Sequence, residues 1–367
     1  MATINPEMLT LAREYRGLTQ EELARTLFVS QAKVARIEGG LQTEVPDILL
    51  DSISSALSFP REFFSQEENR IGFGSSSYFY RKKADLTAAD RKHIHGLVNI
   101  LRIGLKKYIS FVEIGAKKPL PFFDLNEYSG SPAKVAQALR GMWKLPDGPV
   151  KNLTASIEAA GVVVVPCDFG TKAMDATSIR LAEMPPVVFI NFDVPGDRWR
   201  WTLCHELAHL CMHDIPHETM EDEADAFAAE FLMPRVEMQA QFSRYARLRL
   251  QDFANFKQYW KTSMGSLIER AHDLGHLDGN QRRYLWMTMA KLGYRLKEPN
   301  PVEVEAPQTF KKIVQYFREE LKYSPDDLGK LLKLNPRELE SLHGVSSSGA
   351  LVENPMRGRL KVLRGGA

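Results

Sequence analysis

The chain has 367 residues, enough for two or three domains, and its 44% hydrophobic and 26% charged residues are typical of a soluble globular protein. No apolar run reaches the roughly 18 residues of a membrane span, and the first residues lack the basic start and apolar block of a signal peptide. We therefore expect a cytoplasmic protein with no membrane partner. The three cysteines, Cys167, Cys204 and Cys211, are too few for a disulfide framework and lack the spacing of a thiolate zinc site, so we expect them to be reduced and buried.

The net charge of +2 hides an uneven distribution of charge along the chain. Residues 1–65 carry six basic and nine acidic residues, whereas residues 78–120 carry ten basic and three acidic residues. The segment from Met356 onward carries four basic residues and no acidic one. Basic stretches are most often solvated surface. Contact with nucleic acid is the more specific interpretation of both of these stretches.

Residues 1–65 are predicted to form a bundle of short helices. Thr19 is a plausible N-cap, and Glu22 three residues later completes a capping box for a helix that runs to about residue 27. Ser30 caps the next helix, which ends at Glu38 before two glycines.

The rest of the chain is predicted to be mainly helical with one small sheet. Glycines and serines in residues 66–77 indicate a linker, and a basic amphipathic helix over residues 88–113 completes a linking region, 66–125. Strand patterns lie at residues 161–166, 177–181 and 187–192, between a helix over 131–143 and a helical stretch that continues to about residue 295. We expect mainly α structure with an α+β core, in which a three-stranded sheet packs on the helix that follows it. A small helical domain, 301–345, and a basic disordered tail, 346–367, complete the predicted organisation.

The strongest motif is His205-Glu206-Leu207-Ala208-His209. Two histidines four residues apart on a helix point the same way, so both imidazoles can reach one metal ion. Glu206 beside them can take a proton from a water molecule that the metal activates. A surface helix with two incidental histidines is the alternative, but the flanking residues are largely apolar and indicate burial, and buried histidines need partners.

A third ligand is expected from a second helix, over residues 221–232. Glu221 lies on the apolar stripe of that helix, where a carboxylate is costly unless it meets a cation. Asp225, one turn further, can accept a hydrogen bond from the free N–H of a ligand imidazole. Glu223 is the competing choice for the third ligand.

These two blocks resemble the ImmA/IrrE family of metallopeptidases. The resemblance rests on His-Glu-Leu-Ala-His-Leu-Cys-Met-His at 205–213 and on Glu-Asp-Glu-Ala-Asp-Ala-Phe-Ala-Ala-Glu-Phe-Leu-Met-Pro at 221–234, and it covers roughly residues 130–285. It implies a zincin-like domain at residues 126–300 with a helical C-terminal extension, Zn²⁺ as the cofactor, His205, His209 and Glu221 as ligands, and Glu206 as general base.

Three further residues near the motif are weaker candidates. His213 lies one turn beyond His209 and is a possible fourth ligand or transition-state donor, although an ordinary role at the helix end is the default. Arg198 and Arg200 are possible contacts to substrate carbonyls, with a solvated or structural role as the alternative.

Residues 8–57 resemble the XRE-type helix-turn-helix of phage repressors. The resemblance is carried by Gly-Leu-Thr-Gln-Glu-Glu-Leu-Ala at 17–24 and Val-Ser-Gln-Ala-Lys-Val-Ala-Arg-Ile-Glu-Gly at 29–39. It implies a recognition helix that presents Gln31, Ala32, Lys33 and Arg36 to the major groove, with Gln20 near a phosphate. An operator DNA is the expected partner, and a homodimer is possible because such proteins usually read paired half-sites.

Two features of this domain depart from that pattern. Phe28 stands in the turn where the family usually has glycine, at a position that often needs a positive φ, so the turn either differs or tolerates strain. The acidity of residues 1–65 favours the alternative of a module for dimerisation or protein contact, because phosphate attraction dominates DNA affinity.

Together the motifs lead us to expect a DNA-binding regulator that cleaves one specific protein, a transcriptional repressor, in a response to stress, DNA damage or a mobile element. We expect an extended substrate to add as a strand at a sheet edge near residues 187–192. The alternatives are a transcription factor whose metal domain only senses a signal, and an antitoxin or phage-defence regulator that acts by binding a partner.

Overall fold

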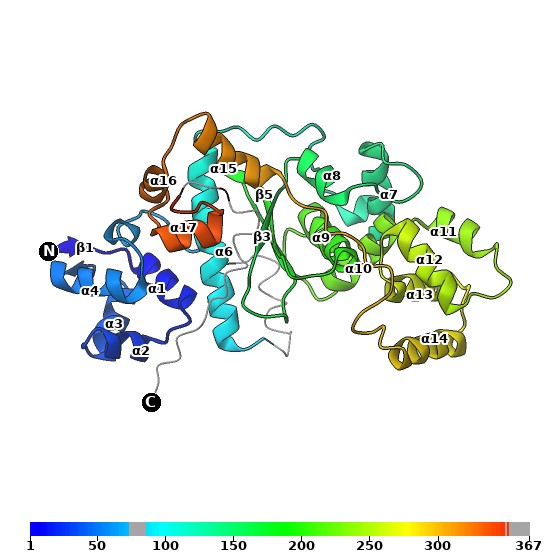
Figure 1. The fold of residues 1–367 in the computed structure, drawn as a ribbon, viewed down its shortest axis with the longest axis horizontal. Coiled ribbons are helices and arrows are strands. Elements are labelled where there is room, and N and C mark those ends of the chain that lie inside the picture. Colours follow the sequence, from blue (N-terminus) through cyan, green and yellow to red (C-terminus); the bar gives the residue numbers. More distant parts are fainter. Residues whose placement is uncertain (73–85, 349–350, 352–367) are drawn as a thin grey trace.

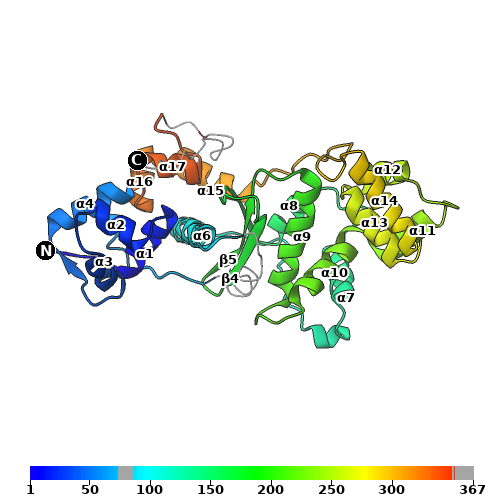
Figure 2. The ribbon, with the colours of Figure 1, turned by 90° about the horizontal axis from the view of Figure 1, so that it is seen from below.

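The computed structural model describes residues 1–72, 86–348 and 351. Figures 1 and 2 show an elongated molecule with the N-terminal helices at one end, helices α12 to α14 at the other, and α6 and the sheet between them. The prediction of a mainly helical chain with a small three-stranded sheet is confirmed. Among the described residues, no helix has the length and apolar character needed to cross a membrane.

Four short helices and a two-stranded ribbon form the N-terminal part. They are α1 (Pro6–Tyr15), α2 (Gln20–Thr26), α3 (Gln31–Glu38) and α4 (Asp47–Leu57), with β1 (Ala2–Thr3) paired to β2 (Glu44–Val45) and a 3₁₀ turn, η1 (Arg61–Phe63). The capping box of Thr19 and Glu22 and the N-cap of Ser30 are present as predicted. Helices α2 and α3 pack through buried Leu23, Ala24, Leu27, Val34 and Ile37.

Helix α6 (Ala88–Ile109) joins this end to the rest of the molecule, because it packs along α1 and also contacts β5 and α16. Gly96 makes the crossing with α1 possible, since a Cβ there would lie 2.7 Å from the backbone nitrogen of Tyr15. The middle of α6 is buried, Arg102 included. Lys92 near its start is exposed, but Lys106 and Lys107 near its end are half-buried, so the helix is less solvated than a basic helix was expected to be. Residues 73–85, which hold part of the predicted linker and of the basic stretch, lie outside the described residues.

The sheet contains β3 (Val163–Cys167), β4 (Ala176–Leu181) and β5 (Met184–Asn191) in the order β3-β5-β4. β3 runs parallel and β4 antiparallel to β5. The expectation that residues 187–192 form a sheet edge is therefore wrong, because β5 is the central strand and its backbone groups already pair on both sides. The edges belong to β3 and β4, and no strand pairs with the outer side of β4 among the described residues.

Both faces of the sheet are buried, and each belongs to a different hydrophobic core. Successive side chains of a strand point to opposite faces, so Val163 and Val165 enter one core while Val164 enters the other. The first core also contains the N-terminal helices and α6, and the second contains α9 (Gly196–Met212) and the helices around it. The continuous apolar run Val162–Val165 is what such a two-sided sheet requires.

The helices of the second core come from before and after the sheet along the chain. Besides α9 they are α7 (Pro132–Met142), α8 (Leu153–Ala159), α10 (Met220–Leu232), α11 (Arg235–Phe242), α12 (Leu250–Trp260), α13 (Met264–Asp273) and α14 (Gly279–Lys291), preceded by the 3₁₀ turn η2 (Leu125–Tyr128). Helix α8 was not predicted. It has only seven residues, too short to display a helical period clearly.

The last helices return to the first core. They are α15 (Thr309–Glu319), α16 (Pro325–Leu332) and α17 (Pro336–His343), and their apolar residues share the core of the N-terminal helices and α6. The segment between α14 and α15 runs across the start of α9. A Cβ on Gly196 would collide there with the carbonyl oxygen of Val302. The predicted tail, 346–367, lies almost entirely outside the described residues, with only 346–348 and 351 placed.

Candidate metal centre

Helix α9 carries both histidines of the central motif. It begins after Pro195, packs against β4 and β5 on one side and contacts α8 and α10 on others, so most of its side chains are buried. One helical turn separates His205 from His209, and their Nε2 atoms are 3.1 Å apart. Two imidazole nitrogens at this distance face a common point beside the helix.

Glu221, in the first turn of α10, lies against both rings. Its Oε2 is 3.4 Å from Nε2 of His205 and its Oε1 is 3.1 Å from Nε2 of His209. Ligands about 2.0 Å from a tetrahedral zinc ion are separated by about 3.3 Å. The three donor atoms therefore form a triangle of the size that one zinc ion needs, and two nitrogens with one carboxylate are a usual donor set for zinc.

The charges of this triangle favour a cation. Burial alone would lower the pKa of His205, but the carboxylates of Asp225 and Glu221 outweigh burial and raise it to about 10. Burial would raise the pKa of Glu221, yet its hydrogen bonds with His205 and His209 lower that pKa. The expected acceptor, Asp225, lies on the far side of the first imidazole, with Oδ1 2.9 Å from Nδ1 of His205.

Glu206 is buried beside the histidines, with 7% of its surface exposed. Its Oε2 has no hydrogen-bond partner among the described residues. A buried carboxylate oxygen without a partner is costly, so this atom is available for a ligand or a water molecule at the site.

Beyond the triangle lies a second group, made of His213, His217 and Glu223. Nδ1 of His213 is 2.8 Å from Nδ1 of His209, and Nε2 of His213 is 3.1 Å from Oε2 of Glu223. Glu223, the competing choice for the third ligand, thus lies against His213 rather than against the His205–His209 pair. His217 and this pairing were not among the predicted site residues, although histidines at 205, 209, 213 and 217 recur at a helical spacing of four residues.

The two arginines at the start of α9 differ in environment. Arg200 is fully buried, donates to the carbonyl of Val150 and pairs with Glu305 on the returning chain. Its guanidinium is therefore enclosed by contacts within the fold, which favours the structural role over a substrate contact for this residue. Arg198 has a largely exposed side chain that pairs with Asp175 at 2.6 Å.

The three cysteines are buried and unpaired, as expected. Burial raises the pKa of all three thiols, those of Cys204 and Cys211 on α9 included. They are therefore protonated at neutral pH, and a neutral thiol is a poor zinc ligand.

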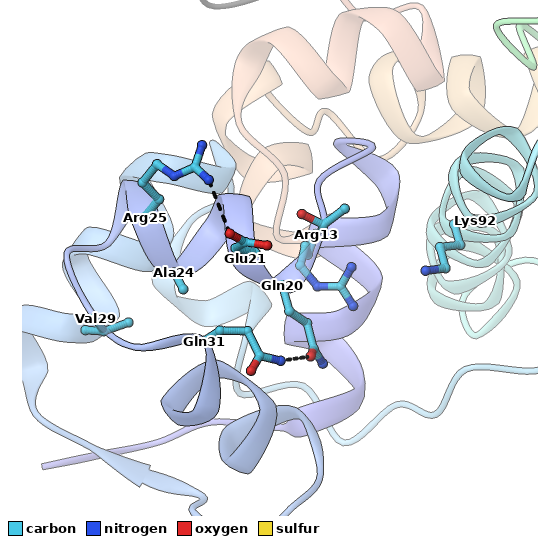
Figure 3. Close-up of a pocket in the computed structure, with 9 residues that line it drawn as sticks. Arg13, Gln20, Glu21, Ala24, Arg25, Val29, Gln31 and Lys92 are labelled. Atoms are coloured by element: carbon cyan, nitrogen blue, oxygen red, sulfur yellow. Dashed lines mark hydrogen bonds and ion pairs between the residues drawn. The ribbon is translucent and has the colours of Figure 1, made fainter.

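A separate cluster connects the first three helices, α1, α2 and α3. Glu38 accepts hydrogen bonds from Arg13 at 2.6 Å and from Gln20 at 2.7 Å, and Gln31 donates to Oε1 of Gln20 at 2.8 Å. Arg13, Gln20 and Gln31 line a hollow of about 930 Å³, and Figure 3 shows them with Lys92 of α6 on its far side. The hollow therefore brings together the start of the expected recognition helix and a lysine that the sequence analysis did not single out.

The remaining residues expected to read DNA lie on α3. Gln31, Ala32 and Arg36 are exposed and Lys33 is half-buried. Phe28, in the turn before α3, has φ 55° and 97% of its surface exposed. The turn therefore keeps the left-handed backbone usual for glycine, and the strain of a phenylalanine there is tolerated.

Residues 157–272 match the family model Peptidase_M78, described as the IrrE N-terminal-like domain. The matched region begins in α8 and ends in α13, so it contains the sheet, α9, α10 and every residue of the metal triangle. The match points to a function of the metallopeptidase type and supports the resemblance to the ImmA/IrrE family. No curated protein matches the chain.

Proposed function

We propose that the chain is a zinc-dependent endopeptidase that also binds DNA, and that it cleaves one specific protein, a transcriptional repressor. The observation that carries the proposal is the triangle of His205, His209 and Glu221, with donor atoms 3.1–3.4 Å apart and Glu206 buried beside it. The family match over residues 157–272 supports the metallopeptidase part.

Zinc held by His205, His209 and Glu221 would lower the pKa of a water molecule in its open position and polarise a substrate carbonyl. The chain's own residues prepare that reaction. Glu206 is the general base, because its unpaired Oε2 can take the proton of the attacking water. Asp225 accepts a hydrogen bond from Nδ1 of His205 and so fixes which nitrogen of that ring faces the metal.

We place the substrate as an added strand on the outer edge of β4, which no strand covers in the part of the chain that the structure describes. This edge strand packs on α9, whereas β5 is enclosed by its two neighbours. An extended peptide there would pair its backbone with β4 and run alongside the helix that carries the two histidines. Arg198, which is exposed and paired with Asp175 just before β4, lies near the end of this edge and is the remaining arginine candidate for a substrate contact.

The DNA-binding part of the proposal rests on the exposed face of α3. Gln31, Ala32, Lys33 and Arg36 are presented together, and Gln20 is held in place by Glu38 and Gln31. A preformed polar surface of this kind suits major-groove contacts, and a homodimer would allow two half-sites to be read.

Glu206→Gln tests the enzymatic part. The variant should keep its zinc, because Glu206 is not a ligand, and should lose cleavage of a candidate repressor that the wild type cleaves. Glu320→Gln, at the exposed end of α15, is the control and should cleave like the wild type. Cleavage retained by Glu206→Gln would refute the assignment of the base, and zinc binding without any cleavage by the wild type would favour a metal-dependent sensor.

A further inference from the structure

His213, His217 and Glu223 form a group whose donor atoms lie within 4.8 Å of one another, which by distance alone is a second metal site. We infer instead that His213 and Glu223 position the ligand His209, and that the hydrogen bond between them keeps the nitrogen of His213 from binding a second ion while the first is bound. The inference rests on the proposed zinc centre and extends it to residues outside the triangle.

The contact between His209 and His213 allows only one proton between the rings. Their Nδ1 atoms are 2.8 Å apart, and both residues are buried. Two Nδ1–H groups cannot face each other at this distance, so one ring must donate and the other must accept.

Zinc bound at the triangle would fix which ring donates. With Nε2 of His209 on the metal, the proton of this ring would be on Nδ1, and His213 would accept it with its own Nδ1. A neutral His213 then carries its own proton on Nε2 and donates it to Oε2 of Glu223 at 3.1 Å. The nitrogen that would bind a second ion is therefore occupied by a proton.

Glu223 is itself held in place for this role. The hydroxyl of Thr219 donates to its Oε1 at 2.7 Å, and Nε2 of His217 lies 3.7 Å from its Oε2. His213 is the C-cap of α9, and its backbone N–H donates to the carbonyl of His209 at 3.1 Å. His213 is thus held at the end of α9, and Glu223 is held in the first turn of α10.

The two ligand imidazoles consequently each have an acceptor on the side away from the metal. For His205 this acceptor is Asp225 directly, at 2.9 Å. For His209 it is His213, whose orientation depends on Glu223. An acceptor of this kind fixes the ring and its tautomer, and its loss usually weakens metal binding 10- to 100-fold.

The test compares zinc affinity, measured by competition with a chelating dye, among variants of the positioning pair. Glu223→Ala and His213→Phe should each weaken zinc binding by about 10- to 100-fold. Glu223→Gln should recover part of the loss, because its amide oxygen can still accept from His213. Asp222→Ala is the matched control, since Asp222 is an exposed neighbour on the same turn of α10, and it should bind zinc like the wild type.

A second readout is the position of the proton in the zinc-loaded wild type. Long-range ¹H–¹⁵N NMR spectra should place it on Nε2 of His213, and metal analysis should give one zinc per chain. Unchanged zinc affinity in Glu223→Ala and His213→Phe, or two zinc ions per chain with one lost in Glu223→Ala, would overturn the inference while the zinc centre stood. A wild type that bound no zinc would instead refute the proposed function.

Discussion

At the scale of single residues, the metal triangle shows what spacing along a helix can and cannot predict. The four-residue interval of His205 and His209 requires a shared direction on α9, and the apolar stripe of α10 places Glu221 toward them. Both acids weighed as the third ligand in fact reach histidines of α9 or its C-cap, Glu221 between the first two and Glu223 at His213. The sequence could not show this second contact, because it depends on how the end of α9 is placed against the start of α10.

Arg200 shows a second limit at the same scale. Its neighbour Arg198 is exposed, and although the helical period places Arg200 on the apolar face with Leu203 and Leu207, that period does not show what pairs with its charge there. The partner that buries Arg200 is Glu305, from a segment more than a hundred residues later. A contact this distant in sequence has no local pattern from which to predict it.

Phe28 yields a prediction about backbone strain. Its φ of 55° is unfavourable for a residue with a Cβ, and its ring is almost entirely exposed, so little packing offsets the strain. Replacing a strained residue by glycine should relieve roughly 1 kcal/mol. We expect Phe28→Gly to be about 1 kcal/mol more stable to urea than Phe28→Ala, which removes the ring but keeps the Cβ. Equal stability of the two variants would mean that the turn is unstrained.

At the scale of elements, types and positions of helices and strands were largely predictable, and their pairing was not. The strands near 161–166, 177–181 and 187–192 correspond to β3, β4 and β5. Their order, β3-β5-β4, places the last strand in the middle, because β5 pairs in parallel with β3 and antiparallel with β4. A strand pattern specifies which face of the strand is apolar, but it does not specify which other strand pairs with it.

The crossing of α1 and α6 gives a prediction about packing. A methyl group on Gly96 would lie 2.7 Å from the backbone of Tyr15, a distance at which the helices must move apart. We expect Gly96→Ala to lower the free energy of unfolding by about 1–3 kcal/mol. Gly141→Ala on α7 is the control, because a Cβ there meets nothing within 4 Å, and it should stabilise the chain slightly. Urea unfolding measures both, and a neutral Gly96→Ala would show that the crossing is loose.

The start of α6 gives a prediction about DNA affinity. Lys92 is exposed and lines the hollow shared with Gln20 and Gln31, so a phosphate bound there would meet its charge. We expect Lys92→Ala to weaken binding of a duplex DNA and to reduce the slope of log affinity against log salt by about one. Lys312→Ala, exposed on α15, is the control and should leave both quantities unchanged. Fluorescence anisotropy over a salt series measures them, and an unchanged slope for Lys92→Ala would remove α6 from the interface.

At the scale of the whole molecule, the sheet separates two cores that the order of the sequence does not suggest. Helices α15 to α17 follow the peptidase-like region along the chain but pack with the N-terminal helices and α6. Arg16 of the N-terminal part pairs with buried Glu338 of α17 at 2.6 Å, across more than three hundred residues. The sequence indicated helices in this region, but a local pattern contains no information about which distant surface their apolar residues would cover.

His343, in this returning part, gives a prediction about stability and pH. The ring is buried between Tyr108 and Phe310, and burial, together with the charge of Lys107, lowers its pKa from an ordinary 6.5 to about 3. As the pH falls from 6.5 toward 3, the unfolded chain binds a proton that the folded chain does not. The folded state therefore loses about 1.4 kcal/mol per pH unit from this group within that window.

The measurement is urea unfolding of the wild type and of His343→Leu at pH 7 and pH 5. Between these two conditions His343→Leu should lose about 2 kcal/mol less stability than the wild type, because it lacks the titrating ring. Comparing the two losses cancels the contributions of other groups. Equal losses in the two proteins would show that His343 is solvated or protonated in the folded state.

The central claim is that one zinc ion is held by two imidazoles of α9 and one carboxylate of α10, and X-ray absorption at the zinc edge tests it most directly. For the zinc-loaded chain we predict one ion per molecule, a nearest shell of nitrogen and oxygen at about 2.0–2.1 Å, and outer scattering from two imidazole rings. Glu221→Ala should lose most of the zinc. A sulfur neighbour at about 2.3 Å, or a chain that does not retain zinc, would contradict the claim.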